Sequence, residues 1–480
     1  MAPNDLIELV VELSKRLEAQ AQQLEAQAER IRGLETENAK LKQLLASAAE
    51  KKGSKAPKFS EDYSVEKHTG KSKSKRGQDA TGRRPQSAKL ELINRTVDVY
   101  EAGVPPSACV ERGRQCVWRI EDGRARYICY RFFTHPNTTT LPPLAGVRNR
   151  LSEYGLEVIL IVAFLHYWIG ISLDHTCAVV EFFTGLALSK SQANSLLTQL
   201  SSDWQGAYDS IAELLSYQLV IYIDETGWQV GKESCYTWAF STAMHVLFRT
   251  GVGRGKAEAQ AIVGEKFAGI GVTDDYGAYQ SLFSEHQLCW AHLLRKAIKL
   301  MLQHPDKDEY KTFLDELYRI YQQAVRWQKD QRLSSGRAEK VERLQARIQR
   351  LCNRAGTAID KEMMPVHEQT FIRLQNELVK GLASLFVFVV HPQVEPTNNR
   401  SERNVRREAE VRKGGRTSKT QAGAKRRGVI MTVLASLNTR FQAFTLQALL
   451  DEIARWAENG ISLFKAELDD IKMAHAPPAA

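Results

Sequence analysis

The sequence predicts an α/β protein built around a mixed five-stranded sheet. Three patterns support this: short apolar runs between residues 219 and 290, helical periodicity over the charged segment 305–380, and a heptad repeat over 5–47. With 480 residues, 43% of them hydrophobic, the chain is long enough for several cores. Its formal net charge of +10 favours a polyanionic partner.

Residues 1–50 are predicted to form a coiled-coil dimerisation helix. Leucine, isoleucine and valine fill most a and d positions of the heptad, and Asn38 occupies one a position, a substitution that fixes register and favours dimers. The alternative is an amphipathic helix that packs on its own domain. Residues 51–89 follow with 12 Lys/Arg against 4 Asp/Glu, which predicts a disordered basic linker or, alternatively, a merely solvated spacer.

Residues 90–142 read as a small β module, because "RTVDVY", "QCVWRI" and "RYICYRFF" are strand-like. Cys109, Cys116 and Cys129 fall here without a C-x2-C knuckle. A zinc site would need a further ligand such as His135, so zinc and a metal-free module both stay open. The seven scattered cysteines of the chain do not form a disulfide framework.

Residues 143–215 are predicted to be a helix-turn-helix-like DNA-binding domain. An apolar helix covers Gly155–Trp168, a second runs from Ser172 to about Phe183, and a third opens at Ser189 with a capping-box spacing. A plain helical domain is the alternative. The predicted reading face comprises Lys190, Gln192 and Asn194.

No membrane span or signal peptide is expected. The apolar stretch 158–173 is about 16 residues long, against the roughly 20 that a transmembrane helix needs. The first ten residues lack a basic region before an apolar core. We therefore expect a cytoplasmic protein.

The catalytic core is predicted in two parts, 216–304 and 391–440, separated by a helical insertion over 305–390. A C-terminal helix and tail cover 441–480. A helix is expected over Lys256–Phe267 and the apolar run "LFVFVV" is ambiguous between strand and helix. The order β-β-β-α-β-α-β is that of an RNase H-like core. The strands are expected at Leu219–Asp224, Tyr236–Ala243, Val246–Thr250, Gly269–Asp274 and Gln287–Trp290, with Thr226-Gly227 as the turn that stops the first.

Three acids stand at points where this fold would bring them together. Asp224 ends the first strand, Asp274 ends the fourth, and Glu402 opens a helix after the insertion. Adjacent carboxylates repel unless a cation lies between them, and hard oxygen ligands favour Mg²⁺ or Mn²⁺. Two such ions would serve an in-line displacement at a phosphodiester. The alternatives are solvated turn acids and a Glu402 that only caps its helix from Asn399.

The segments "IDETGW", "VTDDYGAY", "CWAHLLRK" and "HPQVEPTNNRSERNVR" resemble DDE transposases of the insertion sequence 66 family, the TnpC type. The resemblance implies a DDE triad at Asp224, Asp274 and Glu402, with Asp274 rather than Asp275 as the second acid. It also implies supporting roles: His292 and Arg295 would contact a phosphate, and Asn398, Asn399 and Arg403 would assist the acids.

We therefore expect a bacterial, nucleoid-associated transposase that binds transposon ends and target DNA. It should dimerise or form higher oligomers through its coiled coil, and it should cut and join strands with two Mg²⁺ or Mn²⁺ ions. The family's small accessory proteins are candidate partners. The alternatives are an RNase H-like endonuclease without joining activity and a non-catalytic DNA-binding regulator. Further DNA contacts are expected from Arg406, Arg407, Arg412, Lys413 and Arg416.

Overall fold

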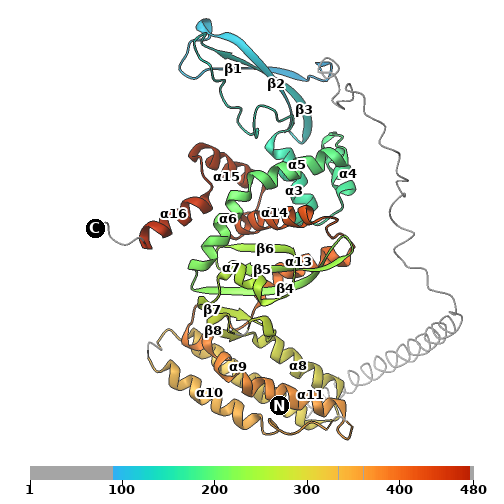
Figure 1. Cartoon of the computed structure of the whole chain (residues 1–480), viewed down its shortest axis with the longest axis vertical. Helices are drawn as coiled ribbons and strands as arrows, with labels where there is room; N and C mark the ends of the chain where they lie inside the picture. Colours follow the sequence, from blue (N-terminus) through green and yellow to red (C-terminus); the bar gives the residue numbers. More distant parts are fainter. Residues whose placement is uncertain (1–89, 280, 333–334, 361, 476–480) are drawn as a thin grey trace, which may run out of the picture. The chain divides into compact units, whose positions relative to one another are not determined.

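The computed structural model describes residues 90–279, 281–332, 335–360 and 362–475 (Figure 1). The predicted coiled coil and the basic linker lie outside the described residues. From Pro85 onward the chain forms one compact unit. None of its described helices combines the length and the apolar character that crossing a bilayer requires.

The small β module is a three-stranded sheet, which confirms the strand prediction for this segment. β3 lies between the other two strands, parallel to β1 and antiparallel to β2. Asp122 and Gly123 have φ values of 50° and 73°, so the left-handed turn between β2 and β3 needs residues that tolerate this region. The strands span Arg95–Tyr100 (β1), Val110–Glu121 (β2) and Arg124–Thr134 (β3).

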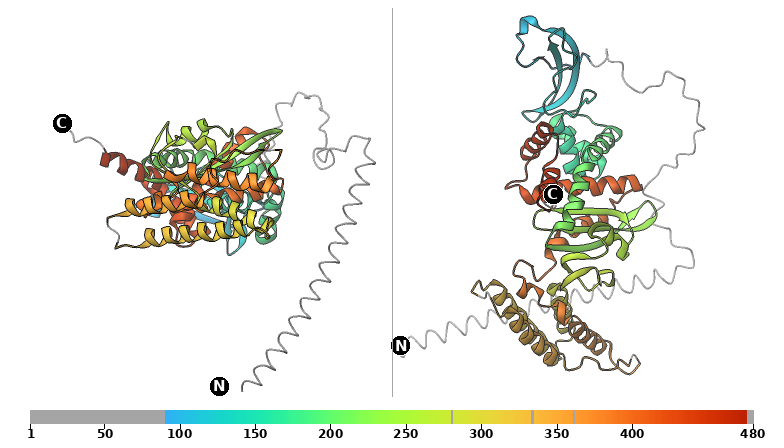
Figure 2. Two further views of the ribbon diagram at one scale, coloured as in Figure 1. Left: turned by 90° about the horizontal axis from the view of Figure 1, so that it is seen from below. Right: turned by 60° about the vertical axis from the view of Figure 1, so that its left-hand side comes forward.

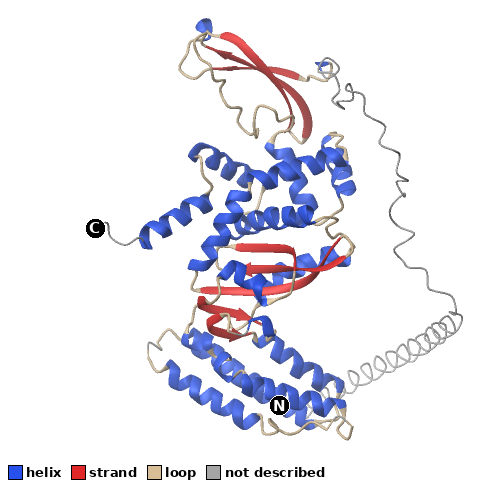
Figure 3. Cartoon of the chain, in the orientation of Figure 1, coloured by secondary structure: helices blue, strands red, loops and turns tan. Residues whose placement is uncertain are grey.

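Helices α3 to α6 form a layer between the two sheets (Figure 3). The caps predicted for α4 and α5 are confirmed: Ser172 accepts from the His175 N–H, and Ser189 forms a capping box with Gln192. The predicted apolar helix does run to Trp168, but its geometry changes, because the α-helical part α3 ends at Ala163 and a π-helical turn covers Phe164–Trp168. The helices span Leu156–Ala163 (α3), Leu173–Thr184 (α4), Lys190–Asp203 (α5) and Gln205–Leu214 (α6).

The central sheet is mixed and five-stranded, as predicted, with the order β6-β5-β4-β7-β8. β4, β5 and β6 form an antiparallel meander, whereas β7 runs parallel to both β4 and β8. This arrangement is consistent with an RNase H-like core. The strands span Val220–Val230 (β4), Glu233–Ser241 (β5), Val246–Val252 (β6), Phe267–Thr273 (β7) and Phe283–Leu288 (β8).

The first strand of this sheet is longer than predicted. β4 continues to Val230, so Thr226 and Gly227 lie inside the strand, and the hairpin turn stands at Gly231, whose φ is 59°. Gly227 has a different role from the one expected. A Cβ there would lie 2.5 Å from Nη1 of Arg412, which donates a hydrogen bond to the Gly227 carbonyl.

Two further expectations about this region change. The helix after β6, α7, covers only Lys256–Val263, and the connection between β7 and β8 holds one 3₁₀ turn, Gly277–Tyr279, instead of the helix implied by the predicted order. A link this short suffices because the parallel strands β7 and β8 are neighbours in the sheet. The ambiguous run "LFVFVV" contains a short helix, Val387–Val390 (α12).

Most of the predicted helical insertion, residues 305–390, is helical, and its long helices lie side by side in both views of Figure 2. Apolar stripes on these helices are buried: Phe313, Leu317, Ile320 and Ala324 on α9, and Leu344 and Ile348 on α10. Their core continues into the sheet through Tyr222, Val272 and Leu288. The helices span Trp290–Gln303 (α8), Asp308–Lys329 (α9), Arg337–Leu351 (α10) and Val366–Lys380 (α11).

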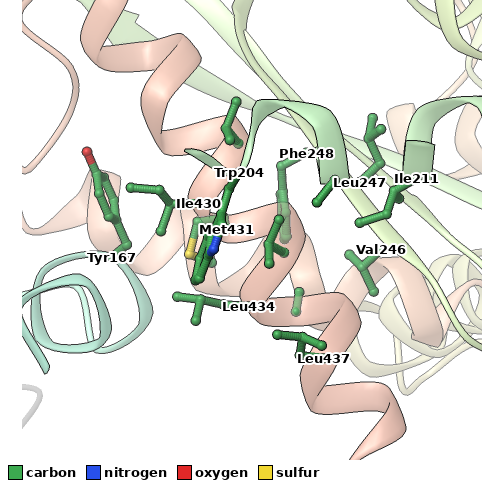
Figure 4. Close-up of a cluster of buried hydrophobic side chains, with 14 of the residues drawn as sticks. Tyr167, Trp204, Ile211, Val246, Leu247, Phe248, Ile430, Met431, Leu434 and Leu437 are labelled. Carbon is green, nitrogen blue, oxygen red and sulfur yellow. The ribbon is translucent and has the colours of Figure 1, made fainter. Parts of the chain in front are cut away.

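The opposite side of the sheet is covered by the long helix α14, Gln421–Arg440 (Figure 4). Met431 and Leu434 pack among Trp204 and Phe248, so one apolar cluster runs from the α5–α6 helices to β6. Helix α13, Asn399–Lys413, precedes it and contacts β4 and β5. Two helices, Leu446–Asn459 (α15) and Leu463–His475 (α16), complete the C-terminal part.

Candidate active site

The parallel pairing of β4 and β7 brings two of the predicted acids to one level of the sheet. Tyr222 pairs with Val272, and Asp224 and Asp274 each stand two residues beyond this pair. Because side chains alternate along a strand, each acid lies on the same face as that paired residue. Two acids from segments 50 residues apart therefore stand at the same end of the parallel pairing, and the charge of Asp274 acts on Asp224.

The carboxyl group of Asp224 is strongly perturbed. Burial, together with the negative charges of Glu225, Asp274 and Glu402, raises the pKa of Asp224 to about 8. One hydrogen bond works in the opposite direction, since the Glu225 N–H donates to Asp224 Oδ1 at 3.0 Å. The charge of Glu402 acts on Asp224 although the two residues are far apart in the sequence, so all three predicted acids share one electrostatic site.

This raised pKa predicts a pH-dependent stability. The folded-state pKa of Asp224, about 8, exceeds the value of about 3.9 for an unfolded aspartate, so between these values the folded chain holds the extra proton. Its contribution to the free energy of unfolding therefore falls as pH rises, by up to about 1.4 kcal/mol per pH unit. In chelator, Asp224→Asn should gain stability over the wild type up to about pH 8 in urea titrations. If the free energies of unfolding of the wild type and of Asp224→Asn change with pH in parallel, the pH dependence does not come from Asp224.

Asp274 is held by a local turn. Its Oδ1 accepts from the Tyr276 N–H at 3.0 Å, an arrangement in which an aspartate ends a strand by bonding its own backbone two residues on. The neighbouring Asp275 is exposed. The choice of Asp274 over Asp275 for the site therefore agrees with the direction in which each side chain points.

Glu225 lies on the other face of β4 and is nearly fully buried. Its carboxylate accepts from the Tyr279 hydroxyl and pairs with Arg254 at 3.0 Å, while the Arg254 guanidinium lies 4.1 Å from the centre of the Tyr276 ring. Tyr276 and Tyr279, the two tyrosines of "DDYGAY", therefore help to hold the part of β4 that carries Asp224 and Glu225. These contacts give Glu225 a structural role beside Asp224.

Polar side chains fix helix α13, the carrier of Glu402, across β4 and β5. Asn398 donates to the carbonyl of Ile223, the residue before Asp224, at 2.7 Å, and Ser401 donates to the carbonyl of Ala239 at 2.8 Å. Sequence reasoning missed Ser401. The three-residue spacing of Asn398, Ser401 and Asn404, which all bond to these strands, was the signal that could have revealed it.

The capping interpretation of Glu402 is wrong. The helix is capped by Asn398, whose carbonyl accepts from the Glu402 N–H, and the Glu402 side chain points away toward helix α8. Asn399, predicted to assist the acids, is exposed. Within the described residues, the supporting amide at this position is therefore Asn398.

Helix α8 supplies the partners of Glu402. Arg295 Nη2 lies 3.1 and 3.0 Å from its two oxygens, and His292 Nδ1 lies 3.6 Å from Oε1. The structure thus brings both predicted supporting residues to the third acid. Cys289, which the sequence did not single out, joins them with its Sγ 3.7 Å from the same oxygen.

The predicted DNA contacts other than Arg407 differ in their surroundings. Arg406, Lys413 and Arg416 are exposed on and just beyond α13, as is Arg403, which was predicted to assist the acids. Arg412 instead donates to the Gly227 carbonyl. On α5, Lys190 pairs with Asp174, Gln192 closes its capping box, and Asn194 accepts from Arg426. The α5 side chains thus have partners within the chain.

Cys116 and Cys129 of the cysteine module are directly opposite each other on β2 and β3, and all described cysteines are free. Among the described residues, the one group of three or more metal-ligating side chains whose ligand atoms all lie within 4.8 Å of one another is Cys289, His292 and Glu402.

One comparison with known proteins identifies the chain. The model of the family "Transposase IS66 family" matches residues 153–426, more than half of the chain, including every acid of the site. No curated protein matches it. Proteins of this family are DDE transposases, which act on DNA and generally use divalent metals. A chain with this match and this sheet belongs to the IS66 family of DDE transposases.

Proposed function

We propose that this transposase cuts DNA at the ends of its own element and joins the freed 3′-OH to target DNA, with Asp224, Asp274 and Glu402 as the catalytic acids. The observation that carries the proposal is the convergence of negative charge on the buried Asp224 carboxyl: burial, and then the charges of Glu225, Asp274 and Glu402, raise the pKa of Asp224 to about 8. Such convergence is costly in the absence of a cation, so it is typical of a functional site.

The residues present fit a divalent metal. Carboxylate oxygens are the ligands that Mg²⁺ and Mn²⁺ prefer, and a cation between the acids would offset the burial and the neighbouring negative charges that raise the pKa of Asp224. Asp224, Asp274 and Glu402 would hold two ions. When bound, these ions would activate the attacking oxygen and stabilise the leaving one.

The chain's own residues would prepare this site. The Asn398 amide would hold the backbone next to Asp224, and the turn at Asp274 would hold that carboxyl group. The bond from Ser401 to β5 would fix the position of Glu402 relative to the sheet. Arg295 neutralises Glu402 in the metal-free chain. On binding DNA, Arg295 would turn from this carboxylate to a phosphate, which keeps its charge paired in both states.

Arg407 is the basic residue best prepared for a phosphate. Its guanidinium lies 3.6 Å from the centre of the Trp168 ring, and burial lowers the pKa of Arg407, while within the described residues it takes part in no ion pair. It opens into a pocket of about 360 Å³. The pocket is lined by Trp168, Ile169, Arg407, Glu410, Val411 and Arg416.

Arg407→Ala should weaken DNA binding several-fold and reduce the slope of log affinity against log salt by about 1, because one phosphate contact would be lost. Fluorescence anisotropy with a labelled end duplex at several salt concentrations measures both quantities. The control is Arg332→Ala, which removes an exposed arginine of the helical insertion. An unchanged slope for Arg407→Ala would assign this side chain a structural role.

Cleavage and joining can be separated in one assay. Labelled element ends are incubated with the full chain, Mg²⁺ or Mn²⁺ and a supercoiled target, and products are resolved on gels. We expect nicked ends and a joined species. Cleavage without joining would support the endonuclease alternative, and end binding without either product would support the non-catalytic regulator.

The partners proposed for this reaction are transposon ends and target DNA, with the family's accessory proteins as candidates. A dimer or higher oligomer formed through residues 1–50 would hold two ends in one complex, and association with the nucleoid would follow from the basic segments. Sedimentation of the full chain and of a chain lacking residues 1–50 tests the assembly.

A further inference from the structure

A second set of metal-ligating groups lies beside the three acids. Cys289 Sγ, His292 Nδ1 and Glu402 Oε1 all lie within 4.8 Å of one another. Cys289 and His292 stand at the start of α8 in a C-x2-H spacing, and Glu402 arrives from α13. This set combines a thiol, an imidazole and a carboxylate, so its chemistry differs from that of the acids alone.

The distances match a tetrahedral centre. Zinc binds sulfur at about 2.3 Å and nitrogen or oxygen at about 2.0–2.2 Å, so at tetrahedral angles the sulfur and oxygen ligands are about 3.6 Å apart, and the nitrogen and oxygen ligands about 3.4 Å. The observed separations from Glu402 Oε1 are 3.7 Å to Cys289 Sγ and 3.6 Å to His292 Nδ1. The third separation, between the Cys289 sulfur and a His292 ring nitrogen, is at most 4.8 Å, so a metal could bind after these side chains adjust.

An unsatisfied nitrogen points to the same ligand. His292 Nδ1 is buried and has no hydrogen-bond partner within the described residues, whereas buried ring nitrogens ordinarily have one. Cys289 Sγ accepts from the Asn398 N–H at 3.2 Å, which fixes the sulfur and would favour its thiolate when a metal displaces the proton. The His292 side chain is 33% exposed and the Glu402 side chain 15%, so water can reach this set and would supply a fourth ligand.

We propose that Cys289, His292 and Glu402 form a binding site for a thiophilic divalent ion of the zinc class. An ion bound there would inhibit the enzyme, because Glu402 would then be unable to bind the catalytic metal ions together with Asp224 and Asp274. Thiolate and imidazole select such ions over Mg²⁺, which prefers oxygen. Binding releases the Cys289 proton to solvent and displaces Arg295 from Glu402. The inhibitory part rests on the proposed function, whereas the binding part does not.

Binding is tested with Co²⁺ as the probe on the metal-free full chain. We expect one equivalent to give the sulfur-to-cobalt charge-transfer band and the intense visible bands of a tetrahedral site, and Zn²⁺ to abolish both. Cys289→Ser should remove the charge-transfer band, and His292→Ala should weaken affinity by about 100-fold or more. The control Cys352→Ser, a buried cysteine in the helical insertion, should leave the spectrum unchanged. A wild-type spectrum without the sulfur band, or an identical one from Cys289→Ser, would overturn the site.

Inhibition is tested by the ratio of cleavage rates in Mg²⁺ with and without stoichiometric Zn²⁺, each variant being compared with itself. The wild type should lose at least about tenfold, and Cys289→Ser should lose much less. Equal sensitivity of both would overturn the inhibitory role and would indicate zinc at the acids. If the wild type cleaves no DNA in Mg²⁺ alone, the proposed function fails, while the cobalt spectra still decide the binding site.

Discussion

Asp224→Asn should abolish both cleavage and strand transfer, by at least about 1,000-fold, while the chain stays folded and binds element ends. The amide keeps the shape of the side chain but removes a negative charge at the centre of the site, so the affinity for the divalent ions and the stabilisation of the transition state are lost together. Rates of product formation with labelled ends in Mg²⁺, measured beside anisotropy for end binding, give both quantities.

The matched control for this substitution is Asp275→Asn. Asp275 stands next to a predicted catalytic acid but is exposed, so its replacement removes the same charge from the same neighbourhood and should leave the rate within a few-fold of wild type. Substantial activity in Asp224→Asn would refute the catalytic assignment. Equal loss in both variants would show that the total charge of the region, and not the position of Asp224, is what matters.

The second large effect concerns stability. Glu408 on α13 and Arg427 on α14 form an ion pair with two hydrogen bonds, of 2.6 and 2.9 Å, and their side chains are 0% and 5% exposed. The Arg427 guanidinium also lies 4.9 Å from the centre of the Trp228 ring on β4. This pair therefore joins the helix that carries Glu402 to the strand that carries Asp224.

Arg427→Met should lower the free energy of unfolding by about 3–5 kcal/mol, because it leaves the Glu408 carboxylate buried without a partner. Urea denaturation followed by circular dichroism measures the change. Glu408→Leu combined with Arg427→Met should recover most of the loss, since an apolar pair of similar volume needs no ionic partner.

Two results would contradict the role of the ion pair. One is a loss in the double variant as large as that in Arg427→Met, which would make packing and not charge the cause. The other is a comparable loss in Arg332→Ala, whose exposed pair with Asp330 should contribute within about 0.5 kcal/mol. Activity of the double variant then reports whether the pair also positions Glu402.

Much of the fold was predictable from local patterns. The strands β5 and β7 begin and end within a few residues of the predicted positions, and the predicted mixed sheet of five strands was confirmed. Apolar runs of strand length and helical stripes are properties of neighbouring residues, so they can be read before any tertiary contact is known. The Ser172 cap of α4 and the capping box of α5 have the same local origin.

The errors arose where distant contacts override local signals. Thr226-Gly227 looks like a turn, but pairing with β5 extends the strand and the glycine makes room for Arg412 from α13. Asn399 and Glu402 do have the three-residue spacing of a capping box. The helix nevertheless starts one residue earlier, because Asn398 bonds to the backbone of β4.

The sequence by itself pointed to Asp224, Asp274 and Glu402, because local periodicity predicted that each ends a strand or opens a helix, although β4 continues past Asp224 to Val230. Only the tertiary structure decided what surrounds them: that Arg295, His292 and Cys289 hold Glu402, and that Glu225 turns to Tyr279 and Arg254. These contacts join segments 29 to 113 residues apart. Such pairs depend on how helices pack on a sheet, and the periodicity of a single segment carries no information about that packing.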